Sequence, residues 1–194
     1  MRIPRTVIAG VTVATTLTGG TVAGCSSHSQ SSSPTSAPAM TAHAPVSDYT
    51  KLLIKASEIN APEPFTAGPA VKNPNGQQGA TTTFTDQDRS HTIIDTIQIM
   101  LDPAAAANAL ESAKDVQSES LHGKPAPVDV GVGGTTISGA PQDRSKGVTM
   151  LLFTEGKAFV TLEFDGPIYA LAPPDFVTEV GQKQDAAVKK GLGG

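Results

Sequence analysis

Hydrophobic and polar positions follow two different periods along the chain, which predicts a mixed domain of helices and strands between Asp48 and Leu192. Alternating apolar positions are typical of half-buried strands, and apolar positions three or four residues apart are typical of helices. The expected elements are a helix over 47–55, an irregular loop over 60–79, strands over 80–85 and 91–101, a helix from 103 to before Gly123, strands over 128–130, 135–137, 148–154 and 158–165, and a helix over about 176–190. This order, α-β-β-α-β-β-β-β-α, contains several hairpin connections. It predicts an α+β fold with a mainly antiparallel sheet and helices packed on it.

Three segments carry helix signals. Ser47 is a candidate N-cap for the first helix. Asp102 can cap the second helix, and Pro103 suits its first helical position. The expected apolar stripes are Ala106, Ala109, Leu110, Ala113 and Val116 in the second helix, and Phe176, Val177, Val180, Ala187 and Val188 in the last.

The clearest hairpin spans residues 148–165 and turns at Glu155-Gly156. Its first arm is apolar on both faces, which predicts a central strand. In its second arm, apolar residues alternate with Lys157, Thr161 and Glu163, which predicts a half-exposed strand.

The N-terminal residues predict a secretory leader over residues 1–24. Arg2 and Arg5 supply a positive start, and an apolar, threonine-rich run follows to Val22. The run ends in Val-Ala-Gly before Cys25, the only cysteine. Small residues before a lone cysteine at this place are typical of a bacterial lipoprotein, in which the leader is cut before the cysteine and its thiol takes a diacylglycerol. The alternative is an ordinary signal peptide with a chance cysteine at its end.

The segment 25–47 predicts a flexible tether that begins at the lipidated cysteine. It consists almost entirely of Ser, Thr, Pro and Ala and has little to bury. His28 and His43 lie too far apart in it for a metal-collecting cluster. Residues 48–194 are expected to form a single domain.

Charge and composition exclude several functions. Removal of the leader leaves 12 basic against 18 acidic residues, a formal charge of −6. An acidic chain is a poor partner for nucleic acid. It is equally unsuited to binding anionic lipid through a cluster of basic residues. With one cysteine, which we assign to the lipid, the domain has no disulfide.

Few residues indicate catalysis or metal binding. Asp86 and Asp88 beside His91 could ligate a cation, but a solvated hairpin loop explains them as well. Glu163 and Asp165 share a strand face and could do acid–base work, although carboxylates at a strand end are usually only solvated. His122 is expected at a helix end, Gly131 to Gly134 at a turn, and Ser138 without a nearby base. We therefore assign no catalytic residue, no cofactor and no metal site.

Two segments of the sequence carry a family resemblance. They are GVTMLLFTEGKAFVTLEFDGP (147–167) and PPDFVTEVGQKQDAAVKK (173–190). With the lipobox and the stalk, they resemble the Lpp/Lpq/Lpr-type cell-envelope lipoproteins of mycobacteria. Similar hairpin-plus-helix endings occur in extracellular sensor domains of actinobacterial Ser/Thr kinases, which generally carry disulfides. The resemblance implies an envelope lipoprotein on the outer face of the cell membrane, and some members of the wider group carry lipids.

These observations favour a non-enzymatic binding module. The expected partners are the membrane, through the lipid on Cys25, and a lipid or an envelope protein. The alternatives are a small envelope hydrolase with a site assembled by the fold, or a lipid carrier. A pocket that holds His91 or His122 beside an acid and a serine would favour the enzyme, and a dry apolar groove would favour the carrier.

Overall fold

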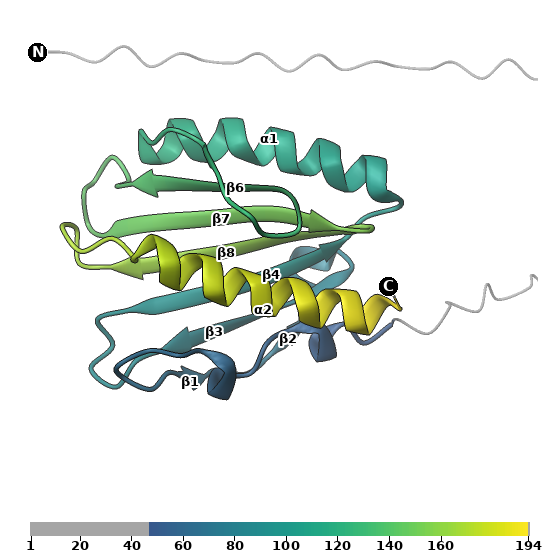
Figure 1. The fold of residues 1–194 in the computed structure, drawn as a ribbon, viewed down its shortest axis with the longest axis horizontal. Helices are drawn as coiled ribbons and strands as arrows, with labels where there is room; N and C mark the ends of the chain where they lie inside the picture. The colour runs from purple at the N-terminus through teal and green to yellow at the C-terminus, as the bar shows by residue number, and fades with distance from the viewer. Residues whose placement is uncertain (1–46, 194) are drawn as a thin grey trace, which may run out of the picture. The chain divides into compact units, whose positions relative to one another are not determined.

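The computed structural model describes residues 47–193 (Figure 1). The predicted signal peptide, Cys25 and the predicted tether up to residue 46 lie outside the described residues. In the described part of the chain, no helix is both long and apolar enough to cross a bilayer.

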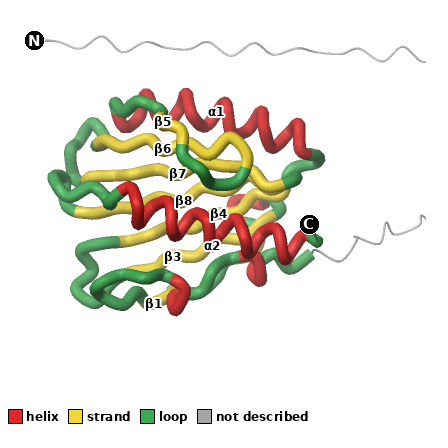
Figure 2. Tube along the Cα trace, viewed as in Figure 1, coloured by secondary structure: helices red, strands yellow, loops and turns green. Residues whose placement is uncertain are grey.

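An antiparallel sheet forms the centre of the fold, as predicted, and it has eight strands (Figures 1 and 2). The strands are β1 (Thr66–Ala67), β2 (Val71–Lys72), β3 (Gly79–Thr85), β4 (Thr92–Ile99), β5 (Ala126–Pro127), β6 (Val132–Gly139), β7 (Gly147–Glu155) and β8 (Ala158–Gly166). Their order is β1-β3-β4-β8-β7-β6-β5, and β2 also pairs with β3. The helices are α1 (Pro103–Leu121) and α2 (Pro174–Leu192), and three short 3-10 turns are η1 (Thr50–Leu52), η2 (Ala56–Glu58) and η3 (Pro74–Gly76).

The two α-helices cover opposite faces of the sheet. The core under α1 contains Met150 and Leu152 of β7, whereas the core under α2 contains Leu151 and Phe153 of the same strand. Because successive residues of a strand point to opposite faces, β7 is buried on both sides, as its apolar sequence predicts.

The second arm of the hairpin is half-exposed on one face, also as predicted, yet it is the middle strand of the sheet. The reason is that α1 packs against β6, β7 and β8 and leaves β3 and β4 uncovered on its side. That open face is rich in threonine. Thr81 and Thr96, for example, lie side by side there with their hydroxyl oxygens 2.8 Å apart.

The helix signals at Asp102 and Pro103 are confirmed, because the Asp102 carboxylate accepts the Ala105 N–H at 2.8 Å. Ala106 and Leu110 of α1 are buried against the sheet. Val116 is 57% exposed, so its place in the predicted apolar stripe was wrong. The stripe turns instead toward Leu121, which is buried near the end of the helix.

The predicted first helix is wrong. The segment forms only η1 and η2, and the chain is extended at Leu53. Tertiary contacts explain the difference: the side chain of Gln184, fully buried in α2, accepts the Ile54 N–H at 3.0 Å and donates to the Leu52 carbonyl at 2.8 Å. These backbone groups are therefore satisfied by α2 instead of by a helix of their own.

Two further expectations need correction. The predicted strand over 128–130 is a tight turn in which Val130 N–H donates to the Val128 carbonyl, and the short strand β5 lies just before it. The predicted loop over 60–79 contains the two-residue strands β1 and β2, which are too short to leave a periodic signal.

Candidate functional site

A cavity of about 750 Å³ lies at one end of the sheet. Three segments distant in sequence line it: residues 60–65, the β3–β4 loop, and the connection from β8 into the first turns of α2. In Figure 1 the β3–β4 loop and the β8–α2 connection lie together on the left side of the domain. The fold thus brings together pieces whose proximity no local sequence pattern reveals.

The walls of the cavity are apolar. Phe65, Ile93, Phe164, Leu171 and Phe176 all contribute to the lining. The rings of Phe164 and Phe176 meet edge to face, with centroids 5.9 Å apart, so strand β8 and helix α2 are joined at this wall.

The rim of the cavity is acidic. Its six carboxylate residues are Glu63, Asp86, Asp88, Asp165, Asp175 and Glu179. Among the described residues that line it, only His91 can carry a positive charge. The cavity therefore combines apolar walls with a negative potential at its mouth.

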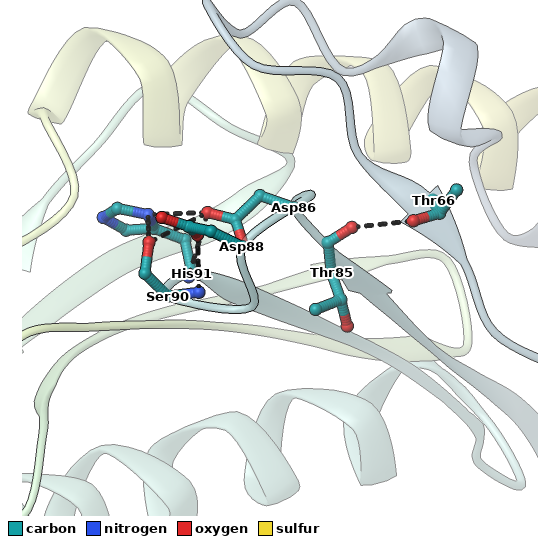
Figure 3. Close-up of polar contacts among 6 residues, drawn as sticks. All are labelled: Thr66, Thr85, Asp86, Asp88, Ser90 and His91. Atoms are coloured by element: carbon teal, nitrogen blue, oxygen red, sulfur yellow. Dashed lines mark hydrogen bonds and ion pairs between the residues drawn. The ribbon is translucent and has the colours of Figure 1, made fainter.

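A hydrogen-bonded group closes the β3–β4 loop beside the cavity (Figure 3). Asp86 Oδ2 accepts the Ser90 hydroxyl and the His91 N–H, each at 3.1 Å, and lies 2.8 Å from His91 Nδ1. Burial by itself would raise the pKa of the Asp86 carboxyl, but the bonds from His91 and Ser90 outweigh burial and hold that pKa below its usual range. Asp86 is therefore a buried carboxylate that stays charged.

The cavity brings His91 together with an acid and a serine, the combination expected to favour an enzyme, but the geometry is not that of a hydrolytic triad. In a triad the acid and the serine contact opposite ring nitrogens of the histidine. Here Ser90 Oγ and Asp86 Oδ2 both lie 2.8 Å from the same atom, His91 Nδ1. The three residues are also within five positions of one another, as is usual for a group that stabilises a hairpin loop.

Two other residues singled out in the sequence lie outside the cavity lining. His122 is the exposed C-cap of α1, in the left-handed conformation with φ of 53°. Ser138 lies within β6, where its hydroxyl oxygen is 3.0 Å from that of Thr149. Neither has the surroundings of a catalytic group.

The carboxylates of Glu163 and Asp165 share one partner, Lys146, at 2.8 and 2.6 Å. Burial raises the pKa of the Asp165 carboxyl, and Lys146 opposes that rise only in part. Lys146, in the loop before β7, was not identified from the sequence. It converts the expected pair of solvated carboxylates into an ion-paired cluster at the cavity edge.

A second hollow, of about 540 Å³, has the opposite charge. It lies between η1, η2 and the C-terminal half of α2, and its rim includes Lys51, Lys55, Lys183 and Lys190. Lys183 is already engaged, because its ammonium donates to Glu179 and to the Glu58 carbonyl. We therefore place the candidate site in the larger, acidic cavity.

Comparison with known proteins supports the fold. No family model and no curated protein matches the chain. Among solved structures, the extracellular domain of PknH from Mycobacterium tuberculosis matches with a TM-score of 0.54 and 10% sequence identity, over 74% of this chain and 94% of that chain. The chain therefore shares its fold with the extracellular domain of a mycobacterial protein.

Proposed function

We propose that this protein is a non-enzymatic binding module of the cell envelope. Its ligand has an apolar part, which enters the cavity, and a cationic group, which meets the acidic rim. The observation that carries the proposal is the pairing of apolar walls with an acidic rim. Asp165 and Glu179 are ion-paired with Lys146 and Lys183, but the other four rim carboxylates have no lysine or arginine partner among the described residues. The fold shared with the PknH extracellular domain supports a role outside the cytoplasm, and the absence of triad geometry at His91 supports binding over catalysis.

The ligand preference can be measured with two amphiphiles of equal chain length, dodecylammonium and dodecanoate. We expect the cationic amphiphile to bind about tenfold more tightly or better, because each tenfold change needs only about 1.4 kcal/mol. Asp175→Lys, at the rim, should reduce that preference severalfold, since it places a positive charge beside the ligand's own.

The matched control is Asp115→Lys, which makes the same charge change on the exposed face of α1, away from the cavity. It should leave the preference nearly unchanged. Equal binding of the two amphiphiles, or an equal effect of both variants, would overturn the proposed ligand class. Native mass spectrometry of the protein purified from its own envelope would then identify the retained molecule.

The proposal also includes a lipid anchor at Cys25, on the outer face of the cell membrane. We expect the mature chain to begin at Cys25 and to partition into the detergent phase, because a diacyl anchor holds where a single acyl chain does not. Cys25→Ala should yield unprocessed precursor or released protein. An alanine variant that was processed at the same bond and remained equally membrane-bound would contradict the anchor.

A further inference from the structure

Three carboxylates converge at one place on the rim of the cavity. Glu63, Asp86 and Asp88 each offer an oxygen, and these oxygens all lie within 4.8 Å of one another. Glu63 follows η2 and is more than twenty positions from the two aspartates, so only the tertiary structure brings it to them. In Figure 3 the side chains of Asp86 and Asp88 lie next to each other in the β3–β4 loop.

Asp86 supplies an independent indication of a ligand. Its side chain is 3% exposed, and its Oδ1 atom is buried with no hydrogen-bond partner in the part of the chain that the structure describes. The other oxygen, Oδ2, is already used by Ser90 and His91. A buried, charged oxygen with no partner is costly, and a bound cation is one of the few groups that would satisfy it.

Among the described residues, the ion-pair partner recorded for the cluster is His91, which contacts Asp86. In the described part of the chain, none of the three carboxylates forms an ion pair with a lysine or an arginine. His91 contacts Asp86 through Nδ1 and thereby orients the carboxylate without occupying Oδ1. Three like charges at this separation repel one another, and a divalent cation removes the repulsion.

We propose that Glu63, Asp86 and Asp88 bind a calcium ion. Calcium takes oxygen ligands at about 2.3–2.6 Å, so that two of its ligands can lie up to about 5 Å apart. Magnesium, with ligands at about 2.0–2.1 Å, draws them closer than about 4.2 Å and demands a more regular geometry. The three oxygens come from the β3–β4 loop and from the separate irregular segment after η2, which suits the flexible geometry of calcium better than the regular octahedron of magnesium, with water completing the coordination. This site does not depend on an organic ligand in the cavity.

Isothermal titration of the full chain in detergent with calcium chloride tests the proposal, at about 0.15 M sodium chloride so that non-specific attraction is screened. We expect one site with a dissociation constant of about 10⁻⁴–10⁻³ M, the range of extracellular calcium modules, and weaker binding of magnesium. Glu63→Gln, which keeps the shape of the side chain and removes its charge, should weaken calcium about tenfold or more. Asp88→Asn serves as the second variant should Glu63→Gln fail to fold.

The matched control is Asp115→Asn, which neutralises an exposed carboxylate of α1 that does not line the cavity. It should change calcium affinity less than about twofold, because a screened surface charge outside the site interacts weakly with the ion. Absence of calcium binding up to about 10 mM would overturn the proposal, since that is above the weakest extracellular sites. Equal weakening by Asp115→Asn and Glu63→Gln would overturn the assignment to these residues. If calcium does not bind, the preference for a cationic amphiphile is unaffected and is tested by its own experiment.

Discussion

Asp95→Asn is expected to raise the free energy of unfolding by several kcal/mol at pH 8 and to leave it nearly unchanged at pH 4. Asp95 lies in β4 and is fully buried, and neither of its oxygens has a hydrogen-bond partner among the described residues. Burial raises the pKa of this carboxyl to about 8, and the nearby Ile54 N–H, which itself donates to Gln184, lowers it only in part. The folded protein therefore holds Asp95 in its neutral form at physiological pH.

The direction of the pH effect follows from the pKa of the Asp95 carboxyl, which is 3.8 in the unfolded chain and about 8 in the folded protein. Below about pH 4 the carboxyl is protonated in both states and has no effect. Between about pH 4 and pH 8 the unfolded chain releases the proton while the folded chain keeps it, so stability falls as pH rises. A difference of about four pKa units corresponds to a loss on the order of 5 kcal/mol, which is a large share of the stability of a domain.

Urea unfolding of the wild type and of Asp95→Asn at a series of pH values measures this effect. The two stability curves should coincide near pH 4 and diverge toward pH 8. Asp115→Asn, on the exposed face of α1, is the control and should follow the wild type throughout. Parallel curves for wild type and Asp95→Asn would mean that Asp95 ionises in the folded protein without penalty, through groups or water that satisfy it.

Phe153→Ala is expected to cost about 3–5 kcal/mol of unfolding free energy. Phe153 is completely buried in β7, in the core shared with α2, and its ring also packs where Gly131 approaches the sheet. Removal of the ring leaves a cavity that the surrounding strands cannot close. Chemical denaturation gives the value directly.

Phe176→Ala should cost less than Phe153→Ala, because Phe176 is only half-buried at the start of α2. Its edge-to-face partner is Phe164, so the double variant of these two residues should be non-additive by about 0.5–1.5 kcal/mol. Lys157→Ala, at an exposed turn, should stay within about 0.5 kcal/mol and serves as the control. A silent Phe176→Ala would mean that the start of α2 is not held on the sheet in solution.

The sequence by itself determined the α+β class, the antiparallel sheet, both long helices and the hairpin of β7 and β8. These elements have local signals: Asp102-Pro103 fixes a helix start because capping and φ are properties of neighbouring residues. The alternation of β8 and the doubly apolar β7 likewise report their burial directly, because side chains of a strand alternate between faces. The lipobox at Cys25 is also local, and it lies outside the described residues.

Tertiary structure alone decided the rest. The segment at 47–58 does not form the predicted α-helix, because Gln184, over 120 positions away, forms hydrogen bonds with its backbone N–H and carbonyl groups. Asp95 reads as one polar position in an alternating strand, yet burial makes it a neutral acid in the core. The candidate site depends on Glu63 and helix α2 meeting the Asp86–His91 loop. The carboxylates of Asp86 and Asp88 were identified from the sequence. Which charges surround them could not be predicted, because electrostatic interactions act through space and the neighbouring residues are brought there only by the fold.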